Sequence, residues 1–127
     1  MNEIILNELE LKTFTEQDAL DYCLLNNINP DKITILFLYN NKLTDISEIK
    51  LFKNIKTLWI SNNKITDISV IKNLTNLEVL GITNLLLESN QIKYIEFLNN
   101  LKYLGCREVF KDRSVLKKLN QNINIIQ

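Results

Sequence analysis

The feature that most constrains the fold of this chain is an internal repeat of 22 residues. Residues 33–54 (ITILFLYNNKLTDISEIKLFKN) align without a gap on residues 55–76 (IKTLWISNNKITDISVIKNLTN), and both contain the string NNKxTDIS. A third unit begins at Leu77 and a fourth at Leu101, and the third carries two extra residues, which we place around residues 88–91. A fixed period of this length predicts a stack of similar units that share one continuous core.

Each unit begins with alternating apolar residues followed by a turn. In the first unit, Leu36 and Leu38 are two positions apart, which places both on the same side of a short strand because strand side chains alternate. Asn41 and Asn63 come directly afterwards in the first two units. A short amide side chain satisfies turn backbone groups well, so stacked units predict an asparagine ladder.

The return leg of each unit has a different period. Ile46, Ile49 and Phe52 are spaced by three residues, which predicts short 3₁₀ or α-helical turns with one apolar side. Asp45 and Asp67 stand just ahead of these turns, where a carboxylate caps the first backbone N–H groups. A catalytic pair of carboxylates is the alternative interpretation, and we favour the caps.

The units fit the pattern L-x-x-L-x-L-x-x-N-x-L, and the chain resembles leucine-rich-repeat proteins over residues 33–109. The period resembles the 22-residue class found in bacterial internalin-like proteins. Leu85 and Val109 depart from the pattern, since they stand where the ladder asparagine is expected. The resemblance implies an α/β solenoid with short parallel strands on a concave face, 3₁₀ or α-helical turns on the convex face and a protein-binding role.

The ends differ from the repeats, as expected for caps that close an otherwise open core. We predict a single domain over residues 1–127, with an N-terminal cap at 1–32, repeats at 33–109 and a C-terminal cap at 110–127. A helix is expected over residues 15–27, with Thr15 as its N-cap and Leu20, Cys23 and Leu24 along its apolar side. A short covering strand is expected at residues 9–11, a helical turn at 114–119 and a final strand at 123–126.

Composition argues against an enzyme. The chain has no histidine, which removes the commonest general base and the commonest zinc ligand. No metal-ligand cluster or glycine-rich phosphate loop is present in the sequence. We therefore expect no catalytic residue, no cofactor and no metal site. Cys23 and Cys106 lie in apolar stretches and are expected to be reduced, buried thiols.

Charge and hydropathy indicate which kinds of partner are not expected to bind and where in the cell the protein is expected to be. Fifteen lysines and arginines balance fifteen acidic residues, so no overall basic excess attracts nucleic acid or an anionic membrane. The first residues show no basic segment followed by an apolar leader, and no apolar run approaches the roughly 20 residues that a membrane span needs. The expectation is a cytoplasmic protein that is a monomer on its own.

If the L-x-L residues point inward, the residues between them point out of the concave face of an expected five-stranded sheet. Large aromatic side chains and arginine dominate binding energy at many protein interfaces. The predicted partner contacts are Phe37, Tyr39, Trp59, Ser61, Gly81, Thr83, Tyr103, Gly105 and Arg107. The alternative is that Trp59 and its neighbours cover one another or lie beneath a terminal segment. Arg107 is the single cation in this set, so we do not expect single-stranded nucleic acid to bind here.

The two glycines of the chain, Gly81 and Gly105, fall in the same column of the repeat as Phe37 and Trp59. Glycine weakens a strand, so its presence usually marks a close approach by another group. That group is either Trp59 itself, lying over Gly81, or a side chain of a partner. The sequence leaves both open, and we favour the partner.

These features favour a module that holds one protein partner. Among such roles we favour a cytoplasmic immunity or inhibitor protein that binds and neutralises a bacterial toxin or enzyme. The rival within the binding class is an internalin-like adhesion or scaffold module, and the rival outside it is an enzyme.

Overall fold

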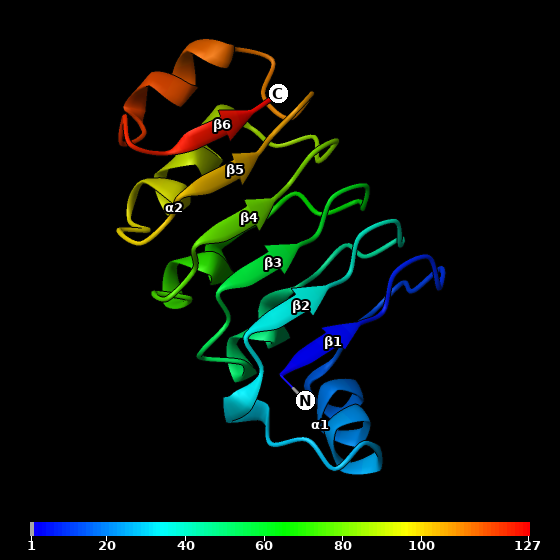
Figure 1. Cartoon of the computed structure of the whole chain (residues 1–127). Helices are drawn as coiled ribbons and strands as arrows, with labels where there is room; N and C mark the ends of the chain where they lie inside the picture. Colours follow the sequence, from blue (N-terminus) through cyan, green and yellow to red (C-terminus); the bar gives the residue numbers. More distant parts are fainter. Residues whose placement is uncertain (1) are drawn as a thin grey trace.

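A computed structural model describes residues 2–127 of the chain. Its strands form one six-stranded sheet in the order β1-β2-β3-β4-β5-β6, and every neighbouring pair is parallel. The strands are β1 (Glu3–Ile5), β2 (Ile35–Phe37), β3 (Thr57–Trp59), β4 (Val79–Gly81), β5 (Tyr103–Gly105) and β6 (Asn124–Ile126). Figure 1 shows them stacked in chain order. The face therefore has one strand more than the sequence suggested.

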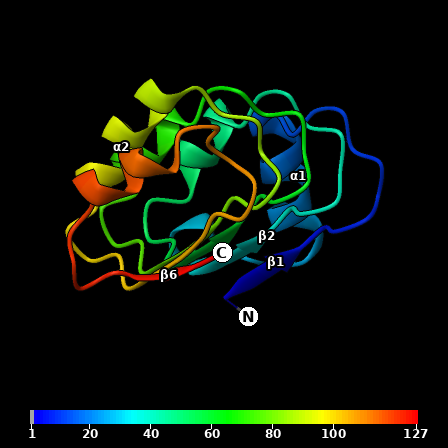
Figure 2. The same ribbon diagram turned by 90° about the horizontal axis from the view of Figure 1, so that it is seen from above.

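Helices and 3₁₀ turns make the return legs and lie together on the other side of the sheet (Figure 2). The α-helices are α1 (Glu16–Leu25) and α2 (Ile92–Glu96); the 3₁₀ turns are η1 (Pro30–Lys32), η2 (Ser47–Leu51), η3 (Ser69–Asn73), η4 (Ser89–Gln91) and η5 (Arg113–Lys118). The two extra residues of the third unit fall at η4. This arrangement confirms the predicted leucine-rich-repeat solenoid. Within residues 2–127, no helix combines the length and the apolar character needed to cross a membrane.

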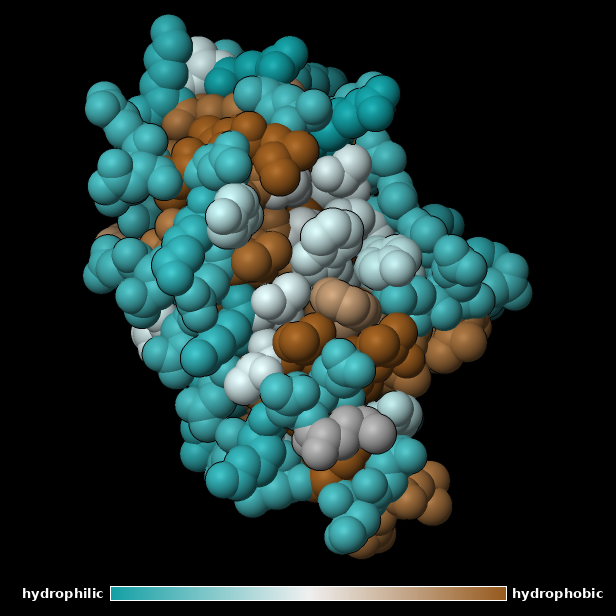
Figure 3. Space-filling model, in the orientation of Figure 1, coloured by the Kyte–Doolittle hydropathy of each residue, from teal (hydrophilic) through white to brown (hydrophobic). Residues whose placement is uncertain are grey.

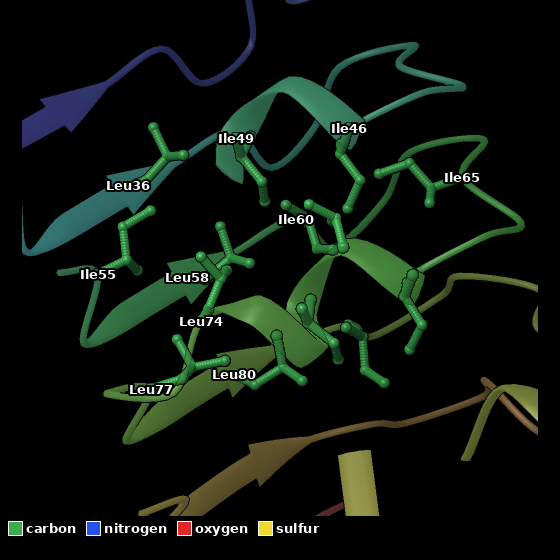
Figure 4. Packing of buried hydrophobic residues seen from close by; sticks show 14 of the residues in the cluster. Leu36, Ile46, Ile49, Ile55, Leu58, Ile60, Ile65, Leu74, Leu77 and Leu80 are labelled. Atoms are coloured by element: carbon green, nitrogen blue, oxygen red, sulfur yellow. The ribbon is translucent and has the colours of Figure 1, made fainter. Parts of the chain in front are cut away.

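The core lies between the strands and the turns and continues through the stack. Leu36 pairs in register with Leu58, Leu58 with Leu80 and Leu80 with Leu104, and all four side chains are fully buried. Figure 4 shows the strand leucines facing apolar residues of the turns, such as Ile49. Burial of one such side chain stabilises the fold by about 1.5–3 kcal/mol. The inward direction of the L-x-L residues is therefore as predicted.

The asparagine ladder is present where the sequence predicts it. The amide oxygen of Asn63 accepts from the Leu43 N–H at 3.0 Å, and its amide nitrogen donates to the Leu38 and Ile60 carbonyls at 3.0 Å each. Asn41 makes the equivalent bonds one unit earlier, where its oxygen accepts from the N–H groups of Leu9 and Leu11 at 3.0 Å. Each asparagine thus joins its own turn to the preceding one.

The N-terminal segment is a further unit of the stack, which corrects the expected position of its strand. The covering strand was expected at residues 9–11, but the strand is β1, and Leu9 and Leu11 belong to the turn that Asn41 holds. Ile4 and Leu6 match the L-x-L positions 32 residues before Leu36 and Leu38. The helix α1, ten residues long, then replaces the usual short return leg.

The cap of α1 is as predicted, but its buried side is not. The Thr15 hydroxyl accepts from the Asp18 N–H at 3.1 Å, and the Asp18 carboxylate accepts from the Thr15 N–H at 2.9 Å. The side chains that pack into the core are Ala19 and Cys23, whereas Leu24 is 81% exposed. Leu20 is also exposed, so of the three residues assigned to the apolar side only Cys23 is buried.

Candidate protein interface

The outward-pointing residues of the strands form a surface that we call the sheet face. It consists of three rows that cross the strands. The first row is Glu3, Ile35, Thr57, Val79, Tyr103 and Asn124; the second is Ile5, Phe37, Trp59, Gly81, Gly105 and Ile126; the third, two residues further on, is Asn7, Tyr39, Ser61, Thr83 and Arg107. Figure 3 shows this side of the molecule, with a band of apolar and intermediate residues flanked by hydrophilic ones. All nine residues predicted as partner contacts lie on the sheet face.

Three aromatic residues of neighbouring strands form a cluster on the sheet face. The ring centroids of Phe37, Tyr39 and Trp59 lie 6.0–6.1 Å apart, with the rings tilted or edge to face. Such pairs contribute about 0.5–1.5 kcal/mol beyond the area they bury, so the cluster is held in place before any partner arrives. Trp59 is nevertheless 42% exposed. Tyr103 lies two strands away on β5 and is also exposed.

The structure decides between the two explanations of Gly81. A methyl group added there would lie 3.1 Å from Cδ2 and 3.3 Å from Cγ of Trp59, so the indole ring lies directly over this glycine. The close approach is therefore internal, and the preference for a partner side chain over Gly81 was wrong.

Gly105 differs from Gly81 because a methyl group there would meet nothing nearer than the Thr83 hydroxyl oxygen at 3.7 Å. That distance is ordinary van der Waals contact. The sheet face therefore has room for an incoming side chain above Gly105.

The remaining predicted contacts differ in accessibility. Ser61 is buried at 7% exposure, and its hydroxyl lies 3.4 Å from the methyl position of Gly81. Thr83 is half-buried and Arg107 is exposed. Neighbouring side chains of the sheet face therefore cover Ser61, whereas Arg107 is open to a partner.

Two residues of the sheet face were not predicted from the sequence. Ile5 and Ile126 end the second row on the outermost strands, and they are 49% and 57% exposed. The signal was available for Ile5, since the segment from Ile4 to Leu6 repeats the L-x-L alternation.

A second ladder runs along the edge of the sheet face and was also missed. Its residues are Glu8, Asn40, Asn62, Asn84 and Glu108, which all have left-handed backbone angles with φ between 54° and 61°. The amide nitrogen of Asn84 donates to the Asn62 oxygen at 2.6 Å, and that of Asn62 donates to the Asn40 oxygen at 2.8 Å. Asparagine tolerates this conformation better than most residues. The first asparagine of each Asn-Asn-Lys string in the repeats could therefore have predicted this second ladder from the sequence.

Asp45 and Asp67 lie on the opposite side of the molecule and act on the backbone. Their carboxylates accept from the N–H groups of Ser47 and Ser69, the first residues of η2 and η3, at 2.7 Å and 2.8 Å. These hydrogen bonds hold the pKa of both carboxyls below the ordinary value. The two aspartates do line a shallow pocket with Thr44. Each aspartate stands one position before the N-cap residue of its turn, Ile46 or Ile68, and still satisfies the first N–H of that turn, which agrees with the favoured interpretation of a backbone role.

The two cysteines are buried and free, as predicted. Burial raises the pKa of both thiols, although the charge of Arg113 opposes the shift at Cys106. A raised pKa keeps a thiol protonated and weakly nucleophilic, so both behave as small core residues.

Comparisons with known proteins agree with this geometry. A family model described as leucine-rich repeats in two copies matches residues 31–73 and 53–87. An internalin (inlF) from Listeria monocytogenes is 29% identical, with a TM-score of 0.67, over 75% of this chain and 28% of its own. Internalin C2 of the same species is 26% identical, with a TM-score of 0.61, over 76% of this chain and 42% of its own. A leucine-rich-repeat protein of Leptospira interrogans is 25% identical, with a TM-score of 0.77, over 99% of this chain and 31% of its own.

No curated protein sequence matches the chain. The chain spans less than half the length of each of the three solved structures, between 28% and 42%. The fold and the matched repeats define a leucine-rich-repeat protein, an architecture whose stacked strands present an extended surface to other molecules. Within that class, the chain is similar to the two internalins.

Proposed function

We propose that this protein binds one protein partner across the sheet face and does so without catalysis. The observation that carries the proposal is the exposed Trp59, which is fixed by Phe37 and Tyr39 and lies near the free space above Gly105. A rigid aromatic side chain beside an open position is a typical anchor, because its binding loses little conformational entropy.

The size of the sheet face limits how the partner sits. With neighbouring strands about 4.8 Å apart, six strands give a face about 24 Å wide. A standard interface buries about 800 Å² on each partner, which favours an additional contact beside the strands. Leu86, in the loop after β4, is 80% exposed and offers such a contact.

The role that we favour is neutralisation of a bacterial toxin or other enzyme by an inhibitor of the immunity type. Support comes from the preformed surface: the strands share one core, so the face is ordered before binding and suits a tight inhibitor. An adhesion or scaffold role is the second candidate, and it is favoured by the likeness to the two internalins.

The experiment compares partner capture by three variants. Trp59→Ala removes the anchor and should weaken binding by about 2 kcal/mol or more. Gly105→Arg places a Cβ where the nearest atom is 3.7 Å away and a long side chain over the sheet face, so it should block binding while leaving the fold intact, as checked by circular dichroism. Glu96→Arg, an exposed change on α2 away from the strands, is the matched control and should bind normally.

A fluorescence measurement adds a direct readout, because Trp59 is the only tryptophan. A partner seated on the sheet face should shift its emission to shorter wavelength. Binding that is unaffected by Trp59→Ala and Gly105→Arg would show that the partner uses another surface.

A separate experiment tests the neutralising role. The product of the gene next to this one is expressed in bacteria with and without this protein. We expect toxicity that wild-type protein relieves and Gly105→Arg does not. A harmless neighbouring product, together with intact partner binding, would favour the adhesion or scaffold role.

A further inference from the structure

The net charge of this chain is zero, but its acidic and basic residues are unevenly distributed between its two ends. Residues 2–22, which contain β1 and most of α1, carry six acidic residues and one basic residue, a net charge of −5. Residues 102–127, which contain β5, η5 and β6, carry six basic residues and two acidic ones, a net charge of +4. Figure 1 shows these two segments at opposite ends of the stack. An acidic end and a basic end therefore face away from each other.

The separation is long compared with the range of electrostatic screening. Six strands about 4.8 Å apart place β1 and β6 about 24 Å from each other, whereas the Debye length at physiological salt is about 8 Å. The two ends therefore do not neutralise each other effectively within one molecule. Each presents its own charge to an approaching molecule.

Within residues 2–127, the outer edges of β1 and β6 pair with no further strand. On β1, the Asn2 carbonyl accepts from the Thr34 N–H and the Leu6 N–H donates to the Phe37 carbonyl, so these residues face β2. Backbone groups alternate in direction along a strand, and those of Glu3 and Ile5 therefore point away from the sheet.

The same alternation holds for β6. The Asn124 N–H donates to the Lys102 carbonyl, and the Ile126 carbonyl accepts from the Cys106 N–H, so both face β5. The backbone groups of Ile125 point away. Within residues 2–127, no other strand covers the outer edge of β1 or of β6. Uncovered edges of this kind are templates for pairing with another chain.

The side chains at the two edges match each other. Ile5 and Ile126 occupy the same row of the sheet face, at its two ends, and both are about half exposed. If β6 of one molecule lay beside β1 of the next, in the parallel register used throughout the sheet, these two residues would become neighbours. The second row would then continue across the junction without interruption.

In place of the monomer expected from the sequence, we propose that this chain associates with further copies of itself head to tail, with β6 of one copy pairing in parallel with β1 of the next. Charge decides this arrangement over a symmetric dimer. Pairing β1 with β1 brings two ends of net charge −5 together, and pairing β6 with β6 brings together two of net charge +4. The junction of β6 with β1 joins opposite charges. Because this junction leaves a free edge on each side, association is open-ended rather than closed at two copies.

The experiment is sedimentation of the purified chain at low salt, from about 10 μM to about 1 mM, a range that covers weak association. The average mass should rise with concentration beyond that of two chains. It should fall to that of one chain in about 1 M salt, where the Debye length is about 3 Å.

Charge-reversed variants test the direction of pairing. Lys111→Glu, Lys117→Glu and Lys118→Glu together change the net charge of the basic end from +4 to −2. Glu10→Lys, Glu16→Lys and Asp21→Lys together change that of the acidic end from −5 to +1. All six residues are exposed. Each triple variant should remain a monomer, because its two ends then carry the same sign. An equimolar mixture of the two should regain association, because each junction again joins opposite charges. Circular dichroism checks that both variants fold.

A backbone variant tests the strand pairing itself. Ile5→Pro removes the outward N–H of β1 and should abolish association. The control Ile5→Thr keeps that N–H, so its association should be closer to that of the wild type. A wild-type chain that stays a monomer at low salt throughout the range would overturn the proposal. So would a mass that levels off at two copies, or a mixture of reversed variants that fails to associate. These measurements use the chain alone, so their failure leaves the proposed partner binding untouched.

Discussion

Replacing Asn63 with alanine measures the contribution of the buried asparagine ladder. Asn63 accepts one backbone hydrogen bond from Leu43 and donates to the carbonyls of Leu38 and Ile60, each at 3.0 Å. Asn63→Ala removes these three bonds, together with a longer one from the same amide nitrogen to the Ser61 carbonyl at 3.2 Å, and leaves partly buried backbone groups without partners. At about 1 kcal/mol for each bond, the free energy of unfolding should fall by about 3 kcal/mol. For a chain of this size, that loss lowers the melting temperature by about 10 °C.

Urea unfolding followed by Trp59 fluorescence and by circular dichroism gives the free energy. The matched control is Asn62→Gly, one residue earlier, which removes an exposed ladder side chain and tolerates the left-handed backbone, φ 54°. This control should cost less than about 1 kcal/mol, because water replaces the lost hydrogen bonds. If Asn63→Ala cost no more than Asn62→Gly, the ladder would not stabilise the turns, and the reasoning would be refuted.

Two further predictions concern the glycines and acid stability. Gly81→Ala should cost about 1 kcal/mol and shift Trp59 emission to longer wavelength, because the added methyl pushes the ring outward; Gly105→Ala should change neither. Equal behaviour of the two variants would contradict the contact. The pKa values of Asp45 and Asp67 are lowered by backbone hydrogen bonds in the folded state, so their contribution is complete above the unfolded pKa of about 3.9. That contribution is lost as the pH falls through the lower folded values. In acid titrations, Asp45→Ala with Asp67→Ala should lose less stability than wild type, and an identical loss would argue against this linkage.

The internal repeat was sufficient to predict the arrangement of the middle of the molecule. Residues 22 positions apart have equivalent surroundings in a stack, so aligning Leu36 with Leu58 fixed which side chains point inward. The same alignment placed Asn41 and Asn63 in one ladder and assigned Trp59 to the sheet face. The constant spacing of 22 residues is enough for these predictions, because each repeat unit packs against another unit of nearly the same sequence.

The N-terminal end was predicted less well because its spacing differs. The N-terminal unit, with Ile4 and Leu6, precedes the unit of Leu36 and Leu38 by 32 residues, and Leu9 stands at the position equivalent to Asn41, which carries the ladder amide. The predicted buried side of α1 was wrong for two of its three residues, since Leu20 and Leu24 are exposed and only Cys23 is buried. A helix at the end of a stack has one neighbour only, and which side meets that neighbour depends on how the connecting chain enters and leaves it.

The sequence by itself determined the class of fold, the inward leucines, the ladder of Asn41 and Asn63, and those residues of the sheet face that lie within the repeats, because all of these follow from one period. Tertiary structure alone decided that Trp59 lies over Gly81 while Gly105 stays open, since that outcome depends on the rotamer of one side chain against the next strand. It also decided that the two charged segments, separated by about eighty residues of nearly balanced charge, lie at opposite ends of the stack. Charges that lie far apart in the sequence lie far apart in space only when successive units stack in chain order. The six parallel strands, in the order β1 to β6, stack in this way.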